Sequence, residues 1–136
     1  MDFKLNELQK DIRDVAREYA QKYIAPRVEE IEKADAFPED LFKIMVDMNL
    51  LGIPYPEEVG GIGAGYLATA IALEEIGKVS ASAATLLTVC YLPLDALHLY
   101  ANEEQVQKYL IPGVAGEYRG SFAFPEPETG SDPKQL

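Results

Sequence analysis

The feature that most constrains the fold of this chain is a run of apolar residues at helical spacing near its beginning. They recur every three or four positions, as Leu5, Leu8, Ile12, Val15, Ala16, Tyr19, Tyr23 and Ile24. Such spacing places them on one face of an α-helix. Asn6 and Gln9 are suited to a capping box at its start. Pro26 is expected to kink or divide the helix because it lacks an N–H, although the apolar pattern resumes with Val28 and Ile31.

Three further segments carry helical patterns of different kinds. We predict a short helix over about residues 38–52 and another over about residues 66–77, with Glu74 and Glu75 facing solvent. Residues 80–100 are apolar on nearly every side. A segment of that kind is expected to be a buried central helix.

The last part of the chain changes character. Asn102 and Gln105 are suited to a capping box at the start of a helix that ends near Pro112. Residues 118–124 then alternate between large and small or polar side chains, which is the period of a β-strand. Because one strand cannot form a sheet, we expect its partners in sequence that follows Leu136.

Together these elements predict an all-α fold. We expect an up-and-down bundle of about five or six helices over residues 1–116. Residues 117–136 are expected to begin a second, β-rich domain, present here as a short strand or extended segment.

Charge excludes some classes of partner. The chain of 136 residues has 23 acidic and 12 basic side chains and a formal charge of −11. Proteins that bind nucleic acids normally present a basic face, so we expect no nucleic acid. The same charge disfavours anionic membrane surfaces. A nucleotide ligand is still possible, because backbone N–H groups can hold phosphates.

The sequence also indicates a compartment. The single cysteine, Cys90, excludes an intrachain disulfide and is expected to be a small core residue. The first residues lack the pattern of a signal peptide. The apolar stretches are interrupted by Pro, Asp or Gly well short of a membrane span. These features predict a soluble protein of the cytoplasm.

Two patterns that suggest ligand sites favour structural roles instead. The glycine-rich segment 60–65 fails the dinucleotide fingerprint, because Tyr66 occupies the final position and no strand precedes it, so a flexible helix connector is expected. His98 has no other His or Cys at metal-ligand spacing and is expected to be a hydrogen-bonded structural residue. We therefore predict no metal site.

The turn at Gly130 and Ser131 is the strongest binding candidate from the residues alone. Such a turn presents backbone N–H groups and a hydroxyl to an anion or to an amide-rich ring. Gly-Ser-Asp is equally common in loops without a ligand. The residues alone leave both interpretations open.

Five motifs, in order along nearly the whole chain, resemble the acyl-CoA dehydrogenase family. They are Ile24-Ala25-Pro26, Gly52-Ile53-Pro54 with Glu58-Val59-Gly60-Gly61-Ile62-Gly63, Glu74-Glu75, Gln105 to Pro112, and Pro125-Glu126-Pro127-Glu128-Thr129-Gly130-Ser131-Asp132. The resemblance implies the N-terminal helical domain of that family, followed by the start of its central β-domain.

The resemblance also implies FAD as the cofactor. The implied flavin contacts are Phe122, Phe124, Pro125, Gly130 and Ser131, and Ser131 is also implied to touch the acyl-CoA thioester. The family usually has Thr where this chain has Pro125, and proline offers neither a hydroxyl nor an N–H. Each lost hydrogen bond costs about 1 kcal/mol. We therefore expect weaker flavin binding than a threonine would give.

A second implied site lies on the apolar helix. By the resemblance, Thr85, Thr88 and Leu92 line the cavity for the acyl chain. Their spacing puts them on one face of a helix. Core packing explains that spacing equally well.

The family removes an α-proton from an acyl-CoA with a carboxylate base while a hydride leaves the β-carbon for the flavin. That base lies much later in family chains, so we assign no catalytic residue here and expect this chain alone to be inactive. The implied partners are acyl-CoA, an electron-transfer flavoprotein and further subunits of a tetramer. The alternatives are an acyl-CoA oxidase, an enoyl-CoA reductase or a flavin monooxygenase of the same fold, or a helical interaction module without catalysis.

Overall fold

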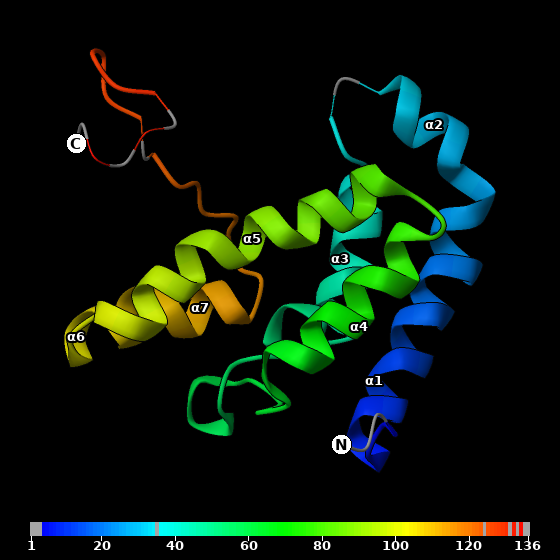
Figure 1. Cartoon of the computed structure of the whole chain (residues 1–136), viewed down its shortest axis with the longest axis horizontal. Coiled ribbons are helices and arrows are strands. Elements are labelled where there is room, and N and C mark those ends of the chain that lie inside the picture. Colours follow the sequence, from blue (N-terminus) through cyan, green and yellow to red (C-terminus); the bar gives the residue numbers. More distant parts are fainter. Residues whose placement is uncertain (1–3, 35, 124, 131, 133, 135–136) are drawn as a thin grey trace.

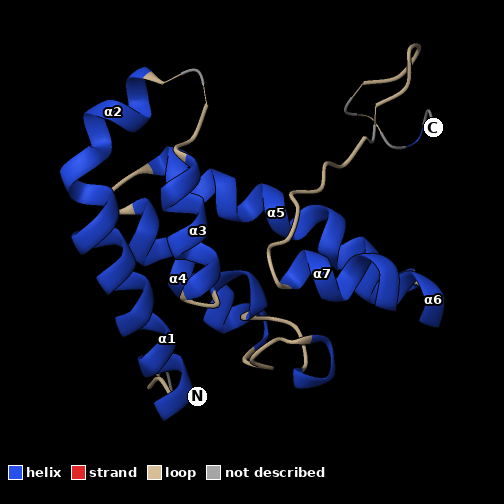
Figure 2. Ribbon diagram, turned by 180° about the vertical axis from the view of Figure 1, so that it is seen from behind, coloured by secondary structure: helices blue, strands red, loops and turns tan. Residues whose placement is uncertain are grey.

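The computed structural model describes residues 4–34, 36–123, 125–130, 132 and 134, and over them the chain is an all-α fold, as predicted. The α-helices are α1 (Glu7–Glu18), α2 (Val28–Lys33), α3 (Glu39–Asp47), α4 (Gly65–Gly77), α5 (Ala81–Tyr100), α6 (Glu103–Gln105) and α7 (Ile111–Val114). Helices α1, α3, α4 and α5 form the body of the bundle, and α6 and α7 lie along the far end of α5 (Figure 1). No strand occurs in the described ranges, so helix packing alone builds the core (Figure 2).

The first helix is one helical path that changes pitch. Asn6 and Gln9 form the predicted capping box, with the Gln9 N–H donating to Asn6 Oδ1 at 2.8 Å. After α1 the chain continues as a π-helical turn, Tyr19–Ile24, and a 3₁₀ turn, Ala25–Arg27, before α2. The 3₁₀ turn contains Pro26, whose missing N–H cannot continue the α-helical ladder. The predicted division at this proline is therefore confirmed.

The connector between α3 and α4 folds back on itself. It contains two 3₁₀ turns, Leu50–Gly52 and Glu57–Val59. The Ile62 N–H donates to the Gly52 carbonyl at 2.8 Å, and the Gly63 N–H donates to the Tyr55 carbonyl at 2.7 Å. These bonds satisfy buried backbone groups without regular structure. The glycine-rich segment connects two helices, as predicted, but it is a compact, hydrogen-bonded loop and not the flexible connector that was expected.

One apolar core runs through the bundle. Its largest fully buried side chains are Tyr19, Ile24, Leu41, Met45, Leu50, Leu51, Ile53, Tyr55, Ile76, Leu87 and Leu110. The buried tyrosines keep hydrogen-bond partners, as buried hydroxyls require. The Tyr19 hydroxyl donates to the Leu41 carbonyl at 3.0 Å, and the Tyr91 hydroxyl donates to the Leu50 carbonyl. Cys90 is buried, as predicted.

Helix α5 is buried on one side only, which corrects the prediction of a helix covered all round. Its buried residues are Ala83, Leu87, Cys90, Tyr91 and Leu94. The opposite face exposes Val89 and Leu92, with 42% and 48% of their surface in solvent. A helix is covered all round only when elements pack on both sides, and the described residues supply one side.

The prediction that every apolar stretch is too short to span a membrane was wrong for α5. By length and composition alone, Ala81–Tyr100 could cross a membrane, with a mean hydropathy of 1.3 and 28% of it buried. A single helix of this kind is weak evidence for a membrane span, because core helices of globular proteins have the same composition. Pro93 and Asp95 lie inside it.

Beyond α7 the chain leaves the bundle as an irregular extended segment (Figure 1). The strand predicted over residues 118–124 is absent from the described residues, and Phe124 lies outside them. An isolated antiparallel bridge joins Glu126 to Thr129 instead. The physical reason is that a strand needs a hydrogen-bonded neighbour, and the described part of the chain offers none. The boundary between two domains near residue 116 stays a prediction.

Candidate functional site

The residues assigned by resemblance to the acyl-chain cavity lie together on the exposed face of α5. Thr85, Thr88 and Leu92 are all exposed. The Thr88 hydroxyl donates to the Ala84 carbonyl at 2.9 Å, a bond within its own helix. These side chains are therefore not packed in the core of the described chain, and their role at an acyl-chain cavity stays a prediction.

A groove accompanies the first of these residues. It has a volume of about 500 Å³ and lies between the start of α5 and the end of α2. Its lining residues are Ile31, Ala34, Ala36, Phe37, Ala81, Ser82, Thr85, Leu86 and Val89. The lining is largely apolar, and the hydroxyl of Ser82, which is part of it, donates to Glu32 Oε1 at 2.8 Å. Of the three predicted residues, only Thr85 lines this groove.

The segment predicted to contact flavin is described in part. Phe122 has 50% of its surface exposed, and Pro125 and Gly130 are also exposed. The bridge between Glu126 and Thr129 consists of two backbone hydrogen bonds of 3.0 and 3.1 Å. Phe124 and Ser131 lie outside the described residues. The described part of this segment is thus an exposed turn that leads to Gly130.

The start of this segment lies against α5. A Cβ atom on Gly120 would stand 2.8 Å from Cγ of Pro93, so the two residues are in close contact. Pro93 follows Leu92 directly in sequence. The structure therefore places Gly120, two residues before the first predicted flavin contact, against the residue that follows Leu92, the last residue of the predicted acyl stripe (Thr85, Thr88 and Leu92). Among the described residues, Gly130 does not contact that stripe.

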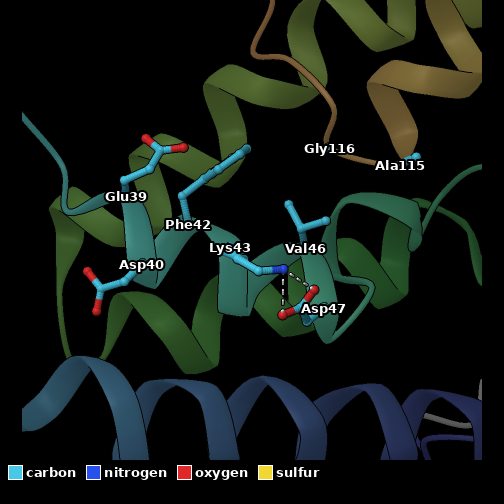
Figure 3. A pocket seen from close by; sticks show the side chains of 8 residues that line it. All are labelled: Glu39, Asp40, Phe42, Lys43, Val46, Asp47, Ala115 and Gly116. Carbon is cyan, nitrogen blue, oxygen red and sulfur yellow. Dashed lines mark hydrogen bonds and ion pairs between the residues drawn. The ribbon is translucent and has the colours of Figure 1, made fainter.

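A cavity of about 400 Å³ lies where the chain leaves the bundle, between α3 and the bend at residues 115–116 (Figure 3). Its lining residues are Glu39, Asp40, Phe42, Lys43, Val46, Asp47, Ala115 and Gly116. Its charged groups are paired: Glu39 with Arg119, Asp40 with Arg27, and Asp47 with Lys43. No nucleophile and base meet there, so the cavity shows no catalytic grouping.

Glu75 is a correction to the sequence analysis. It was expected to face solvent, but only 8% of its surface is exposed. Its carboxylate accepts hydrogen bonds from Arg17 Nε at 3.0 Å and from Lys78 Nζ at 2.8 Å. These two bonds, the first from Arg17, lower the pKa of Glu75. Arg17 lies on α1, so no local pattern could reveal the pair.

Another polar cluster ties the connector to α5. The Asp95 carboxylate accepts from the Tyr55 hydroxyl at 2.8 Å and from the Tyr66 hydroxyl at 3.2 Å. Burial, followed by the bond to Asp95, raises the pKa of Tyr55. His98 is exposed and meets the Tyr55 ring edge-on, at 5.5 Å between ring centroids. Among the described residues no group of His, Cys, Asp or Glu is arranged to hold a metal ion.

Comparison with known proteins places this arrangement in a family. Residues 6–117 match the family model described as "Acyl-CoA dehydrogenase, N-terminal domain". A relative, the probable acyl-CoA dehydrogenase YngJ of Bacillus subtilis, is 38% identical over 133 residues, which cover 97% of this chain and 35% of the relative. The chain thus spans about a third of the length of the curated relatives it matches.

Solved structures agree with the sequence relatives. The butyryl-CoA dehydrogenase of Megasphaera elsdenii has a TM-score of 0.89 at 29% identity, over 96% of this chain and 35% of that one. A structure of PigA with FAD and proline has a TM-score of 0.84 at 27% identity, over 96% of this chain and 35% of that one. With a family model over most of its length and this helical fold, the chain belongs to the acyl-CoA dehydrogenase family and corresponds to its N-terminal domain.

Proposed function

We propose that this chain is the part of an FAD-dependent acyl-CoA dehydrogenase that supplies one wall of the acyl-chain cavity and the start of the flavin site. The observation that carries the proposal is the uncovered face of α5. Thr85, Thr88 and Leu92 are exposed there, and the segment leading to Gly130 starts beside Pro93. An apolar face exposed on a domain that spans about a third of its relatives is expected to be covered by ligand or by the rest of the protein.

The described part of the flavin segment fits a flat ring. Phe122 exposes half of its surface. A Cβ on Gly130 would have no other atom within 4 Å, so a planar ligand can approach its backbone. A relative of the same fold is described in a structure with FAD and proline. FAD, when bound, would accept the hydride that leaves the β-carbon of the acyl group.

The chain's own residues would bind and orient the substrate. Leu92 and the methyl groups of Thr85 and Thr88 would pack against the acyl chain and exclude water from it. The Thr88 hydroxyl is already bonded to Ala84, so it would present its methyl group. Phe122, Phe124 and Pro125 would contact one face or edge of the flavin, and the backbone at Gly130 and Ser131 would donate to it.

The base that removes the α-proton is not among these residues. In the family it belongs to a later helical domain, so the chain alone is expected to be inactive and to retain FAD weakly or not at all. The complete enzyme would be a cytoplasmic homotetramer that passes its electrons to an electron-transfer flavoprotein.

One observation favours a second reaction on the same fold. Pro125 stands where the family usually has a threonine, so a hydroxyl and an N–H are missing beside the flavin ring. A change there affects the flavin and its reaction partner more than the acyl-CoA. The alternatives are an acyl-CoA oxidase, an enoyl-CoA reductase or a flavin monooxygenase.

The test is flavin reduction in the complete gene product that contains residues 1–136. The purified protein is mixed with acyl-CoA thioesters of different length without oxygen, and the absorption of oxidised flavin is followed. The proposal predicts bleaching by acyl-CoA, fast reoxidation by electron-transfer flavoprotein and slow reoxidation by oxygen. Fast reoxidation by oxygen would support the oxidase, and bleaching by NADH with reoxidation by enoyl-CoA would support the reductase. A protein that binds neither flavin nor acyl-CoA would contradict the whole proposal.

A further inference from the structure

Three consecutive residues fasten the chain to the bundle just before the predicted flavin segment. The Tyr118 hydroxyl donates to the Tyr109 carbonyl. Arg119 Nη2 lies 2.6 Å from Glu39 Oε2 on α3. Gly120 packs on Pro93 of α5. The exit of the chain is therefore attached to three separate parts of the helical domain.

Arg119 makes the most extensive of these attachments. Besides its ion pair with Glu39, its guanidinium carbon lies 4.7 Å from the centre of the Phe42 ring, a cation–π contact. Its side chain and that of Glu39 are 40% and 72% exposed. Such an exposed ion pair is weak alone. Ion pair and ring contact together hold the planar guanidinium in one orientation.

The surroundings of Arg119 allow little freedom to the chain beside it. Gly116 has a φ of +72°, and a Cβ there would stand 2.4 Å from a methyl group of Val46. Gly120, the residue after Arg119, packs on Pro93, so the chain lies beside α5 as well as α3. The segment is thus directed between two helices.

We propose that Arg119 is a positioning residue, which holds the exit of the chain between Glu39 and Phe42 of α3 so that the chain enters the flavin-contacting segment beside Pro93 of α5. The proposal rests on the proposed function for the identity of the ligand. The clamp itself, defined as Arg119, Glu39 and Phe42, rests on the distances above. Through it, the helical domain fixes where the flavin segment starts relative to the acyl stripe of α5.

The first experiment tests the clamp without any flavin. Amide hydrogen exchange is measured by mass spectrometry on peptides that cover residues 113–119, in the wild-type chain and in Arg119→Met. Within them, the N–H groups of residues 115–117 donate to the carbonyls of residues 111–113, so their exchange is slow while the bend beside Arg119 is held. Methionine keeps an apolar side chain but lacks the positive charge and the N–H donors of the guanidinium. We expect exchange in these peptides about tenfold faster in the variant, with exchange in α1 and α4 unchanged. Unchanged exchange at residues 115–117 would overturn the proposal.

Two further variants separate the clamp from a general loss of charge. Lys43→Met removes another cation and another ion pair from α3, the pair with Asp47, without touching the exit segment. It is expected to leave exchange at residues 115–117 at the wild-type rate. The charge swap of Glu39→Arg with Arg119→Glu is expected to recover part of the slow exchange, because it rebuilds the ion pair with opposite signs but not the contact of residue 119 with the Phe42 ring. A swap that exchanges as fast as Arg119→Met would contradict the pairing.

The second experiment asks whether the clamp positions the flavin. FAD affinity and the visible circular dichroism of bound flavin are compared between the wild-type gene product, Arg119→Met and the swap. We expect about tenfold weaker binding and an altered dichroism band in Arg119→Met at unchanged melting temperature, with partial recovery in the swap. Faster exchange with unchanged affinity and dichroism would refute the positioning role. A wild-type protein that binds no FAD would refute both that role and the proposed function, whereas the exchange data would still decide whether the clamp exists.

Discussion

Arg17 and Glu75 join the first and fourth α-helices through one buried carboxylate: Arg17 Nε lies 3.0 Å from Glu75 Oε2, and only 8% of Glu75 is exposed. Lys78, on the turn after α4, reaches the other oxygen at 2.8 Å. The helices α1 and α4 pack against each other. Two cations thus hold the carboxylate at a helix interface. A neutral group at this position would leave Arg17 and Lys78 without a negatively charged partner there.

Glu75→Gln is expected to destabilise the chain. The amide keeps the shape but loses the charge that accepts from Arg17 and Lys78, and charge-assisted bonds at a partly buried site are worth about 1 kcal/mol or more. Urea unfolding at neutral pH should show a loss of about that size. Glu74→Gln, on the exposed neighbour, serves as the control and should change little. Equal effects of the two variants would contradict the role of the buried carboxylate.

The same carboxylate predicts a pH dependence. The hydrogen bond from Arg17, followed by that from Lys78, holds the pKa of Glu75 below its usual 4.5. The unfolded chain therefore takes up this proton at a higher pH than the folded chain does. The stabilisation is complete above the ordinary pKa and is lost as the pH falls through the lowered one. Between pH 6 and about 3, wild type should lose more stability than Glu75→Gln. Other lowered carboxyls, such as Asp14, contribute to both proteins, so the difference between them is the measurement.

Gly61→Ala should be far more damaging than Gly60→Ala. A Cβ on Gly61 would stand 2.0 Å from the Tyr55 carbonyl oxygen, and that carbonyl is held in the core of the connector. A Cβ on Gly60 meets nothing within 4 Å, although its φ of +87° is unfavourable for alanine. We expect a loss of about 1 kcal/mol for Gly60→Ala from backbone strain alone. Thermal unfolding should show a clearly larger loss for Gly61→Ala, and similar melting temperatures would contradict the close contact.

The exposed face of α5 predicts an asymmetry between two leucines on one helix. Leu87 is fully buried, so Leu87→Ala should cost about 2–5 kcal/mol. Leu92 is 48% exposed, so Leu92→Ala should stay within about 0.5 kcal/mol in this chain. Urea unfolding decides both. A large cost at Leu92 would mean that its face is packed in the domain itself and is not available to a ligand.

Pro125→Thr should strengthen flavin binding. Threonine restores a hydroxyl and a backbone N–H at a position that the proposed function places beside the flavin ring. Two hydrogen bonds of about 1 kcal/mol each would tighten FAD binding by up to about thirtyfold. Fluorescence titration of FAD with the gene product measures this, and Pro127→Thr in the same segment is the control. No gain from Pro125→Thr would contradict the placement of residue 125 at the ring.

Local sequence signals predicted the helices and their starts well. They failed where burial or pairing depends on residues far away in the sequence. The capping boxes at Asn6 and Asn102 formed as predicted, because a cap depends on residues three positions apart. Glu75 is paired with a residue of another helix, Arg17. The sequence around Glu74 and Glu75 therefore could not show that one of the two is exposed and the other buried. The covering of α5 and the pairing of residues 118–123 depend on what packs beside them, which periodicity cannot report.

The candidate site could be predicted only in part for the same reason. The spacing of Thr85, Thr88 and Leu92 gave their common face, and only coordinates could show that the face is exposed. The clamp at Arg119 carried no motif, because its partners are on α3, far away in sequence.

The central claim is that residues 122–131 contact the flavin, and photolabelling tests it most directly. The gene product is loaded with a photoreactive FAD analogue, irradiated and digested with trypsin, which cleaves after Arg119 and Lys134 and releases the whole segment as one peptide. The account predicts that the label is found on this peptide and that excess FAD prevents the labelling. Label confined to other peptides, with the segment from Gly120 to Lys134 unmodified, would contradict it.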